Sequence, residues 1–554
     1  MNVKTLNEQF VVEGFGTDGV LNKFEANLPD NFNFAYDVID KIAELEPNRR
    51  ALLWCDDNGD ERTFTYKDLS EKSNQVANMF TANGVKKGDM VLCVLKRHYQ
   101  IWFTILALEK IGAVLIPATN QLMAKDYVYR FKSGDVKYVV ATSENDVPSH
   151  IEQSLSEYKG LAGMFLAKGS RDGWVDFDNE MVKYPTTIAR VDNKWTDNML
   201  AFFSSGTTGY PKMVTHDHSY AVAHLLTSKH WHHCHADTVH LTISESGWGK
   251  FFWGKFYGEF MMGATVFAYD FAKFSADGIL SRLVKYGVTS LCCPPTMFRM
   301  LLKDGLDAYD LSKLEYATTA GEALNPEVFN RFKELTGITL MEGFGQTETV
   351  LSIGNLYGQT PRTGSMGRPV PLYNCDIVDE DGKSCPVGET GEIVIRYEEG
   401  KPVFGLFREY YGNPEATAAT KCNGLYHTGD TAYKDEDGYY WYVGRTDDVI
   451  KSSGYRIGPF EIESVMLEHP AVFEVAITPV KDAVRGQLVK ATVVLSSEYK
   501  DKAGDELVKE LQNFVKTNTA PYKYPRIVEF VGELPKTISG KIRRVEIRDR
   551  DNNK

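Results

Sequence analysis

The stretch Val91-Leu-Cys-Val-Leu95, taken with the segments that follow it, decides the fold class of this chain. A helical pattern covers residues 100–109, and further apolar runs follow at Ala113-Val-Leu-Ile116 and Tyr138-Val-Val-Ala141. Continuous apolar strands that alternate with helices indicate parallel sheets covered on both faces. The sequence therefore predicts an α/β protein whose large N-terminal domain contains two parallel-rich sheets.

The pattern changes after Val370. Shorter segments separated by turn signals such as Asp381-Gly382 and Asp437-Gly438 predict hairpins and an antiparallel β subdomain. The segments beyond this subdomain suffice for a small α+β domain, with strands expected at 475–478 and 489–495 and a helix at 505–517. We expect a large domain over residues 1–445 and a small mobile domain over 446–554.

The composition bounds the class of protein. A chain of 554 residues is too long for one core, and 43% hydrophobic with 25% charged residues is typical of a soluble globular protein. A net charge of −13 argues against general binding to nucleic acid or anionic membranes. Glu109 and Lys110 interrupt the most apolar region, 101–118, which favours a helix and a strand over a membrane span. Because residues 1–8 contain no apolar leader, we expect a cytoplasmic protein.

Cysteine and histidine spacing argues against disulfides and against a structural metal site. Eight cysteines without Cys-x-x-Cys spacing predict reduced, packed thiols. Residues 230–240 hold five histidines and Cys234, but they lack the paired spacing of zinc sites and lead into a strand-like run at 238–243. We therefore expect no metal at this histidine cluster.

Residues 521–550 reverse the sign of the chain. Eight Lys or Arg against four Asp or Glu give this basic stretch a net charge of +4. Such a stretch is ordinarily a solvated amphipathic tail. The motif inside it, Pro535-Lys-Thr-Ile-Ser-Gly-Lys541, favours instead a local patch for an anionic ligand.

An earlier run, Ser204-Ser-Gly-Thr-Thr-Gly-Tyr-Pro-Lys212, shares the cationic, glycine-containing character of that motif. Glycine lets backbone N–H groups approach phosphate oxygens, and a lysine on a distant loop can complete the anion site. The run is not a Walker A element, because Gly209 is followed by Tyr210 and Pro211. Taken alone it reads equally well as a surface loop, but the two runs together predict nucleotide-dependent chemistry divided between two domains.

Six motifs in chain order resemble those of the adenylate-forming enzymes, the superfamily of acyl-CoA synthetases, luciferases and peptide-synthetase adenylation domains. The resemblance covers essentially the whole chain, and the chain is identified as a member of this superfamily. The runs 452–461, 524–526 and 533–541 resemble most the medium-chain acyl-CoA synthetases. The six motifs are 204–212, 321–324, 343–349, 426–430, 444–463 and 535–541.

The resemblance implies an ATP site with definite roles. Glu348 binds Mg²⁺ through a hard carboxylate oxygen, and Asp430 accepts hydrogen bonds from the ribose hydroxyls. Arg445 helps to hold the sugar, and Phe344 stacks on adenine where many relatives have tyrosine. In isolation, Asp430 would read as a turn residue. The implied nucleotide-binding residues are Ser204, Ser205, Gly206, Thr207, Thr208, Gly209, Lys212, Gly321, Glu322, Ala323, Phe344, Gln346, Thr347, Asp430 and Arg445.

Lys541 is the strongest catalytic candidate. A carboxylate attacks the α-phosphate of ATP only when the charge of both anions is neutralised, and by resemblance Lys541 bridges the two, with Glu348 and Thr208 as further catalytic residues. The acyl-adenylate then reacts with the thiol of coenzyme A. Relatives rotate the small domain between these half-reactions, and Asp447 resembles the hinge residue, although it fits an ordinary turn equally well. The implied coenzyme A contacts are Gly454, Tyr455, Arg456, Lys523 and Arg526.

Gly345 bears on the size of the acid. Acetate-using relatives have tryptophan directly before the Gln-Thr-Glu motif, so glycine is expected to admit a larger acid, with Trp248 and Phe252 lining the space. Core packing is an equal alternative for these aromatic side chains. Lys250 and Lys255 are unusual beside an aliphatic pocket; they fit the rim, a limit on chain length, or recognition of a polar or branched acid.

The expected activity is that of an ATP-dependent acid:CoA ligase of fatty acid metabolism, which uses ATP, Mg²⁺ and coenzyme A and releases AMP and pyrophosphate. Two alternatives stay open. The chain could load acids onto a carrier protein, or it could bind an acyl-adenylate or nucleotide without catalysis, which the presence of both Glu348 and Lys541 disfavours. The expected partners are small molecules rather than nucleic acid, and a homodimer is left open.

Overall fold

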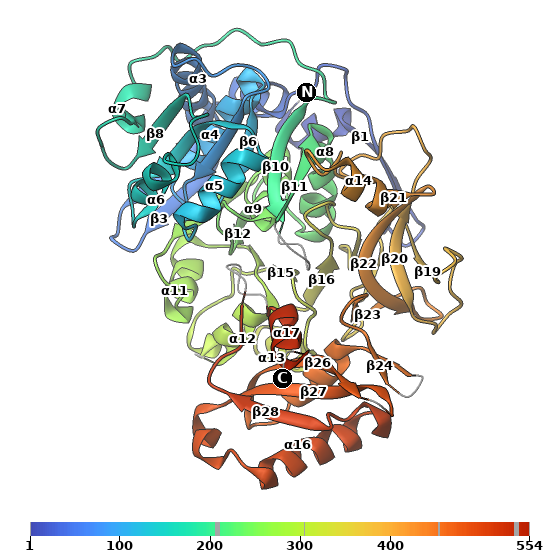
Figure 1. Ribbon diagram of the computed structural model, residues 1–554. Helices are drawn as coiled ribbons and strands as arrows, with labels where there is room; N and C mark the ends of the chain where they lie inside the picture. Colours follow the sequence, from blue (N-terminus) through green and yellow to red (C-terminus); the bar gives the residue numbers. More distant parts are fainter. Residues whose placement is uncertain are drawn as a thin grey trace.

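The computed structural model describes residues 2–204, 211–303, 305–452, 455–482, 484–536 and 542–552. Within these ranges the strands form two large sheets, an antiparallel sheet, a C-terminal sheet and an N-terminal hairpin (Figure 1). The hairpin joins β1 (Val11–Phe15) to β2 (Leu21–Ala26). The two large sheets confirm the predicted α/β class.

The first large sheet has the strand order β11-β10-β6-β5-β7-β8-β9, and its neighbours run parallel except for the β10–β11 pair. The predicted order of strand, helix and strand after residue 91 is confirmed. α4 (Gln100–Ile111) is buried along its whole length, which its apolar sequence allows, and packs on α3 (Tyr66–Ala82). The strands are β5 (Met90–Val94), β6 (Val114–Pro117), β7 (Val136–Thr142), β8 (Gly163–Ala167), β9 (Val175–Asp176), β10 (Asn198–Ser204) and β11 (Lys212–Asp217).

The second large sheet has the order β18-β17-β16-β15-β14-β12-β13-β3-β4, with parallel strands from β16 to β3 and antiparallel strands at both edges. α11 (Ala276–Tyr286), α12 (Pro295–Lys303) and α13 (Pro326–Thr336) share one hydrophobic cluster with it. The strands are β3 (Arg50–Asp56), β4 (Glu61–Thr65), β12 (Val239–Thr242), β13 (Thr265–Asp270), β14 (Ser290–Cys292), β15 (Tyr316–Thr319), β16 (Leu340–Phe344), β17 (Ile353–Gly354) and β18 (Arg368–Pro369).

Shorter helices connect the strands of the two sheets. They are α1 (Val3–Leu6), α2 (Lys41–Leu45), α5 (Ala124–Ser133), α6 (Val147–Ser154), α7 (Phe177–Met181), α8 (Ser219–Leu225), α9 (Gly249–Gly254) and α10 (Tyr257–Met261). Two π-helical segments, Ala35–Asp40 and Leu226–Trp231, adjoin α2 and α8. Among the described residues, no helix combines the length and the apolar character needed to cross a bilayer.

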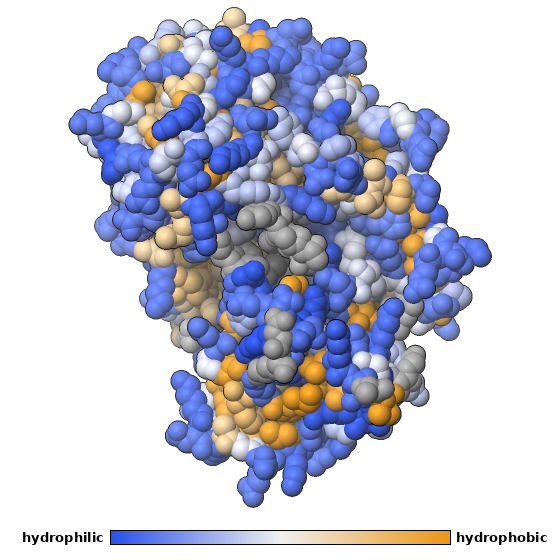
Figure 2. Space-filling view, viewed as in Figure 1, coloured by the Kyte–Doolittle hydropathy of each residue, from blue (hydrophilic) through white to orange (hydrophobic). Residues whose placement is uncertain are grey.

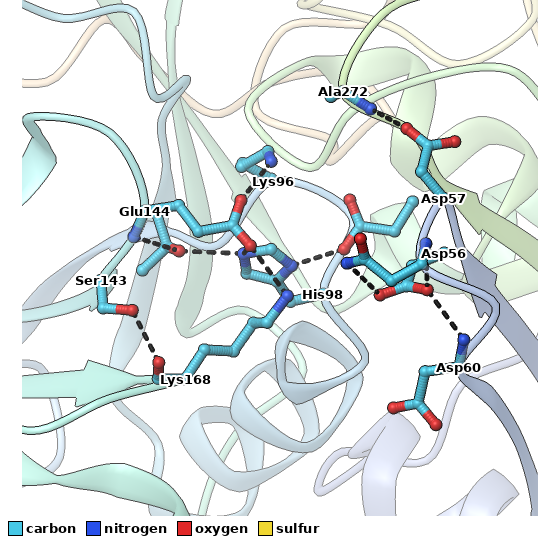
Figure 3. A network of polar contacts seen from close by, with 12 residues as sticks. Asp56, Asp57, Asp60, Lys96, His98, Ser143, Glu144, Lys168 and Ala272 are labelled. Atoms are coloured by element: carbon cyan, nitrogen blue, oxygen red, sulfur yellow. Dashed lines mark hydrogen bonds and ion pairs between the residues drawn. The ribbon is translucent and has the colours of Figure 1, made fainter.

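A polar network ties the two large sheets together (Figure 3). His98, which follows β5, places Nδ1 2.5 Å from the carboxylate of Asp270 at the end of β13 and Nε2 2.9 Å from the hydroxyl of Thr142 on β7. Glu144 accepts hydrogen bonds from Lys96 at 2.5 Å and Lys168 at 2.8 Å. These contacts hold the carboxyl ends of β5 and β7 of the first sheet close to the carboxyl end of β13 of the second sheet.

The antiparallel subdomain predicted after Val370 is confirmed. Its strands lie in the order β19-β20-β22-β21, with β23 paired to β22, on the right of Figure 1. The elements are β19 (Asn374–Val378), β20 (Gly391–Arg396), α14 (Pro414–Thr420), β21 (Lys421–Cys422), β22 (Leu425–Lys434) and β23 (Tyr440–Arg445).

The C-terminal elements form a separate α+β unit at the bottom of Figure 1. β27 pairs with β26, β24 and β28, and α15 and α16 pack on the sheet. Apolar side chains gather on the face that carries β28, whose residues are all partly exposed (Figure 2). The elements are β24 (Ile450–Ser452), β25 (Tyr455–Ile457), α15 (Pro459–Leu467), β26 (Val472–Asp482), β27 (Gly486–Leu495), α16 (Asp505–Asn518), β28 (Ile527–Val531) and α17 (Arg544–Asn552).

Candidate active site

Asp430 is the centre of a dense polar cluster. It lies on β22, opposite Arg445 of β23, and is almost completely buried. Gln346 donates to Oδ2 at 2.6 Å, Arg445 donates to the same oxygen at 3.2 Å, and Tyr442 donates to Oδ1 at 3.0 Å. These donors orient the carboxylate of Asp430 within the cluster.

The glycine before Asp430 is required by its surroundings. Gly429 has a φ of +70°, a left-handed conformation that other residues rarely adopt. A Cβ at this position would also stand 2.8 Å from Nη2 of Arg445. The Thr-Gly-Asp sequence therefore sets the approach of the Arg445 guanidinium to the carboxylate.

Glu348 follows β16 and lies close to the Asp430 cluster. Tyr410 donates a hydrogen bond to its Oε1 at 3.0 Å, and the backbone N–H of Phe407 donates to its carbonyl at 2.7 Å. Burial raises the pKa of Glu348, while the hydrogen bond from Tyr410 and the charges of Arg445 and Lys212 act in the opposite direction. A cation at this carboxylate would offset the cost of its burial.

Gln346 contacts Asp430 and lies two residues before Glu348 in the chain. Its Nε2 donates to Asp430 and to the carbonyl of Thr428, while its Oε1 accepts from Tyr426 at 2.6 Å. Since Gln346 and Glu348 are two residues apart, one short segment holds both Glu348 and the partner of Asp430. The donor set around Glu348 suits Mg²⁺, because a carboxylate with one oxygen held by a phenol leaves a hard oxygen for the ion.

Other predicted nucleotide residues lie at the carboxyl ends of parallel strands. Phe344 ends β16, and its ring centroid is 6.4 Å from that of Tyr442. Residues 321–323 follow the adjacent strand β15, and Glu322 accepts a hydrogen bond from Thr296 at 2.6 Å. The carbonyl of Thr347 contacts Nε2 of His216 at 2.8 Å. In open α/β sheets ligands bind at such strand ends.

The glycine-rich loop is described only at its flanks. Ser204 ends β10 and pairs in register with Lys212, the first residue of β11. Lys212 places Nζ 4.7 Å from the ring centroid of Tyr410, the tyrosine that contacts Glu348. Several predicted site residues lie outside the described residues: Ser205, Gly206, Thr207, Thr208, Gly209, Gly454 and Lys541.

The region predicted to bind the acyl group is tightly packed at Gly345. A Cβ on this residue would stand 2.4 Å from the indole of Trp253 and 2.5 Å from the Val350 carbonyl, so glycine is needed for the approach of Trp253. Nζ of Lys250 lies 4.6 Å and 5.2 Å from the ring centroids of Trp231 and Trp253. This amine is buried and has no hydrogen-bond partner among the described residues.

The remaining predicted pocket residues differ in exposure. Phe252 is fully buried, with its ring centroid 5.3 Å from those of Phe202 and Phe251, which matches the core-packing alternative. Trp248 is partly exposed and caps the N-terminus of α9. Lys255 is fully buried and donates to the carbonyl of Ser244 at 3.0 Å, so it does not lie at a solvent-exposed rim.

The small domain holds the predicted coenzyme A contacts. Tyr455 is half exposed and stacks on Tyr522 with ring centroids 4.0 Å apart. The guanidinium of Arg526 lies 4.9 Å from the ring centroid of Tyr524. Lys523 donates to both oxygens of Glu461, at 2.7 Å and 2.5 Å. Arg456 belongs to β25, but its side chain lies outside the described part of the chain.

The interpretation of residues 521–550 as a free patch for anions needs correction, because most of its described cations bind carboxylates of the same domain. The pairs are Lys523–Glu461, Lys536–Glu474, Arg543–Glu546, Arg544–Glu463, Arg548–Asp448 and Arg550–Glu529.

The predicted hinge residue, Asp447, sits between the domains in the chain. Its carboxylate lies 3.8 Å from Nε of Arg445 on β23 and 3.6 Å from Nη2 of Arg548 on α17. The backbone carbonyl of Asp447 accepts a hydrogen bond from Arg548 at 2.8 Å. Asp447 thus contacts both Arg445 at the end of β23 and Arg548 on α17.

The histidine cluster is occupied by hydrogen bonds. His232, His240 and Glu259 place ligand atoms within 4.8 Å of one another. Both nitrogens of His232 contact Thr318 and the Trp253 carbonyl, and both nitrogens of His240 contact hydroxyls. Burial lowers the pKa of both imidazoles, so they are neutral. These contacts use the lone pairs that a metal would need.

Sequence reasoning missed Tyr410, Tyr426 and Tyr442, which contact Glu348, Gln346 and Asp430. Each tyrosine lies at most 80 residues from its partner in the sequence, and the two residues belong to different strands or loops. The available signal in the sequence was weak. Tyr426 lies shortly before the Thr-Gly-Asp motif, and Tyr442 lies shortly after the turn at Asp437-Gly438. Tyr426 belongs to the motif 426–430, but no pattern in the sequence separates Tyr410 and Tyr442 from ordinary core residues.

Comparisons with known proteins agree with this geometry. Residues 39–411 match the family model of the AMP-binding enzymes, and residues 461–541 match that of the AMP-binding enzyme C-terminal domain. Acyl-coenzyme A synthetase ACSM3, mitochondrial, of Mus musculus is 40% identical, over 95% of this chain and 92% of the relative. Acyl-coenzyme A synthetase ACSM4, mitochondrial, of Mus musculus is 41% identical over 96% and 92%.

Solved structures are similar as well. The anthranilate CoA ligase AuaEII in complex with anthranoyl-AMP superposes with a TM-score of 0.87 at 28% identity, over 95% of this chain and 98% of that one. A benzoate CoA ligase from Burkholderia xenovorans LB400 gives a TM-score of 0.81 at 27% identity, over 93% and 100%. The chain belongs to the AMP-binding, adenylate-forming enzymes and, within them, to the acyl-coenzyme A synthetases.

Proposed function

We propose that the enzyme joins a carboxylic acid larger than acetate to coenzyme A through an acyl-adenylate, with release of AMP and pyrophosphate. The observation that carries the proposal is that Gln346, two residues before Glu348 in the chain, donates a hydrogen bond to Asp430. It brings a candidate metal ligand and a candidate ribose acceptor into one site. Relatives named acyl-coenzyme A synthetases and a structural neighbour that holds anthranoyl-AMP support the same chemistry.

In this proposal the carboxylate oxygens of Asp430 accept the ribose hydroxyls, because Gln346, Arg445 and Tyr442 fix their direction. Glu348 holds Mg²⁺, which when bound supplies positive charge at the phosphates. Lys541 bridges the attacking carboxylate and the α-phosphate. The carboxylate oxygen forms a bond to phosphorus, and the bond to pyrophosphate breaks with its electron pair.

The acyl group would lie beside Gly345, where Trp253 limits the depth of the space. The unpartnered amine of Lys250 favours an acid that offers a hydrogen-bond acceptor or π-surface near the two indoles. We propose a short- or medium-chain acid, with branched and aromatic acids included, as the substrate class. Replacing Trp253 by alanine should extend the accepted length.

For the second half-reaction we propose rotation of the small domain, residues 446–554, about Asp447 relative to residues 1–445. The pantetheine arm would pass Gly454, with Tyr455, Arg456, Lys523 and Arg526 near the nucleotide part of coenzyme A. The exposed stack of Tyr455 on Tyr522 supports this assignment, since it offers a flat aromatic surface. We also propose a cytoplasmic location, although several relatives carry the description mitochondrial.

The first experiment measures pyrophosphate release with acetate, butyrate, isobutyrate, hexanoate, octanoate and benzoate, each with and without free coenzyme A. We expect at least one acid other than acetate to turn over and to form its coenzyme A thioester. Product that forms only with a carrier protein would favour the carrier-loading alternative, and failure with every acid would favour silent binding.

Lys541→Ala tests the catalytic assignment. We expect this variant to lose adenylation while it still converts supplied acyl-adenylate and coenzyme A to thioester, because in this proposal the lysine acts only in the adenylation step. Normal pyrophosphate release by the variant would refute the role of Lys541.

A further inference from the structure

Glu463 on α15 joins three elements of the small domain. Its Oε1 accepts from the backbone N–H of Ile477 on β26 at 2.8 Å and from Arg544 at 3.1 Å and 2.8 Å. Its Oε2 accepts from Nη2 of Arg544 at 2.7 Å. The carboxylate side chain is only 9% exposed, and bidentate pairing fixes the guanidinium in angle as well as in distance.

Arg544 is the first residue of α17, and the chain just before it is also held. Lys536 and Ile542 form an antiparallel bridge, and the N–H of Arg543 donates to the carbonyl of Pro535 at 2.8 Å. The described residues on both sides of 537–541 are therefore paired with each other. The bond to Glu463 then attaches this pair to α15.

A second contact holds α17 one turn further along. Arg548 binds the carboxylate of Asp448 and, at 2.8 Å, the carbonyl of Asp447. Helix α17 is thus tied at its start to α15 and at its middle to the predicted hinge. Both contacts use cations of the basic stretch 521–550. The charge of these cations therefore stabilises the internal structure of the small domain.

We propose that Arg544, through Glu463, is a positioning residue for the adenylation half-reaction. The pair holds residues 542–544, directly after Lys541 in the chain, against α15, and loss of this anchor should slow the half-reaction that uses the lysine. This inference rests on the proposed function of Lys541. The thioester half-reaction, which does not use that lysine, should not depend on the pair.

The test separates the two half-reactions. Adenylation is measured as pyrophosphate release with the fastest acid of the panel named above, and thioester formation is measured from the synthetic adenylate of that acid and coenzyme A. We expect Arg544→Met to lower the adenylation rate about 10²-fold, the scale expected for a misplacement of roughly 1 Å, with little change in thioester formation. Arg544→Lys, which keeps the charge without the bidentate geometry, should lie between Arg544→Met and the unaltered enzyme.

The matched control is Arg543→Met, because Arg543 is adjacent and exposed, and among the described residues its guanidinium forms an ion pair only with Glu546 of α17. It should leave both rates unchanged. Arg544→Met introduced into Lys541→Ala should cause no further loss of adenylation, since both changes remove the same contribution. Should Arg544→Met prove insoluble, Arg544→Lys provides the same comparison.

Equal losses in both half-reactions, or a further loss in the Lys541→Ala background, would overturn the positioning role. An unaltered adenylation rate in Arg544→Lys and Arg544→Met would do so as well. If Lys541→Ala itself adenylates normally, the proposed function of the lysine fails, and that result is distinct from a failure of Arg544.

Discussion

Charged side chains are arranged in opposite ways around Asp430 and in the basic stretch 521–550. Asp430 collects donors from two segments, with Gln346 after β16 and Tyr442 and Arg445 on β23. In the basic stretch, cations such as Lys523 and Arg544 are bound by carboxylates of their own domain. We expect the first region to present its charge to a ligand, whereas the second uses its charge to hold the small domain together.

The difference shows that the net charge of a segment is a poor measure of the charge available to a ligand. Four of the six partners of the basic stretch lie outside it, and Glu461 is 62 residues from Lys523 while Glu463 is 81 residues from Arg544. A count of charges within the segment cannot include them. A motif with a defined donor pattern, such as Thr-Gly-Asp, is the better guide.

The largest effect should follow from a change in the first region. Asp430→Asn keeps the shape but weakens the acceptor, and a site built to hydrogen-bond a hydroxyl loses most of its selectivity when that acceptor is changed. We expect kcat/KM for ATP in adenylation to fall by about 10²–10³-fold. Comparison of ATP with 2′-deoxy-ATP checks the cause, because the unaltered enzyme should prefer ATP and the variant should not.

Asp376→Asn is the matched control for Asp430→Asn. Asp376 lies in the same antiparallel sheet, on β19, and is bound by Arg396 and Ser384 away from the cluster. Its change should leave the preference for ATP intact. If Asp430→Asn still discriminates between the two nucleotides, the ribose assignment is wrong.

A smaller effect is expected from Tyr410→Phe, which removes the hydrogen bond to Oε1 of Glu348 but leaves the ring beside Lys212. A hydrogen bond to a charged group contributes about 1.5 kcal/mol, so the Mn²⁺ concentration for half-saturation of ATP binding should rise about tenfold. Direct Mn²⁺ titration by electron paramagnetic resonance measures this. Tyr411→Phe is the control, since Tyr411 donates to Asp135 instead, and an equal rise there would contradict the assignment.

These two sites also show how far sequence reasoning reaches. The strands around residues 91 and 113, the antiparallel subdomain and the family were predictable, because periodicity and motifs are local properties of the sequence. The contact of Tyr410 with Glu348 was not, since it depends on residues 407–411 running beside β11, an arrangement set by tertiary pairing. The close packing of Trp253 against Gly345 likewise could not be predicted from the sequence, because it depends on the tertiary positions of both residues.

Substitutions in the second region, the basic stretch 521–550, should have small effects on the KM for coenzyme A. The direction of the effect should depend on which member of an ion pair is replaced. If Glu461 competes with coenzyme A for Lys523, Glu461→Gln should lower the KM for coenzyme A by about twofold to fivefold, because exposed ion pairs contribute at most about 1 kcal/mol. Lys523→Met should raise the same KM by a similar factor. Lys536→Met, whose partner is Glu474, serves as the control. A rise in the KM for coenzyme A in Glu461→Gln would contradict this competition. It would show that Lys523 and Glu461 contribute to coenzyme A binding together.

The smallest effect concerns charges that serve structure alone, at the junction of the two large sheets. Burial by itself would raise the pKa of Glu144, but hydrogen bonds from Lys168 and Lys96 lower it to about 2. A depressed carboxylate pKa stabilises the folded state above the unfolded value near 4.5 and loses that contribution as the pH falls toward 2. Because the side chain is 34% exposed, solvent screening reduces the contribution to about 1 kcal/mol.

Glu144→Gln should therefore lower the Tm by about 2 °C at pH 7, and the difference from the unaltered protein should shrink as the pH falls from 4.5 toward 3. Thermal unfolding followed by circular dichroism at several pH values measures this difference. Glu44→Gln is the control, since Glu44 forms only an exposed pair with Lys41 and should change neither the Tm nor its pH dependence. Both half-reactions should keep their rates in Glu144→Gln, because the network lies apart from the Asp430 cluster. A loss of adenylation without a change in Tm would mean that this junction takes part in the site, and that the division between ligand-directed and structural charge is drawn in the wrong place.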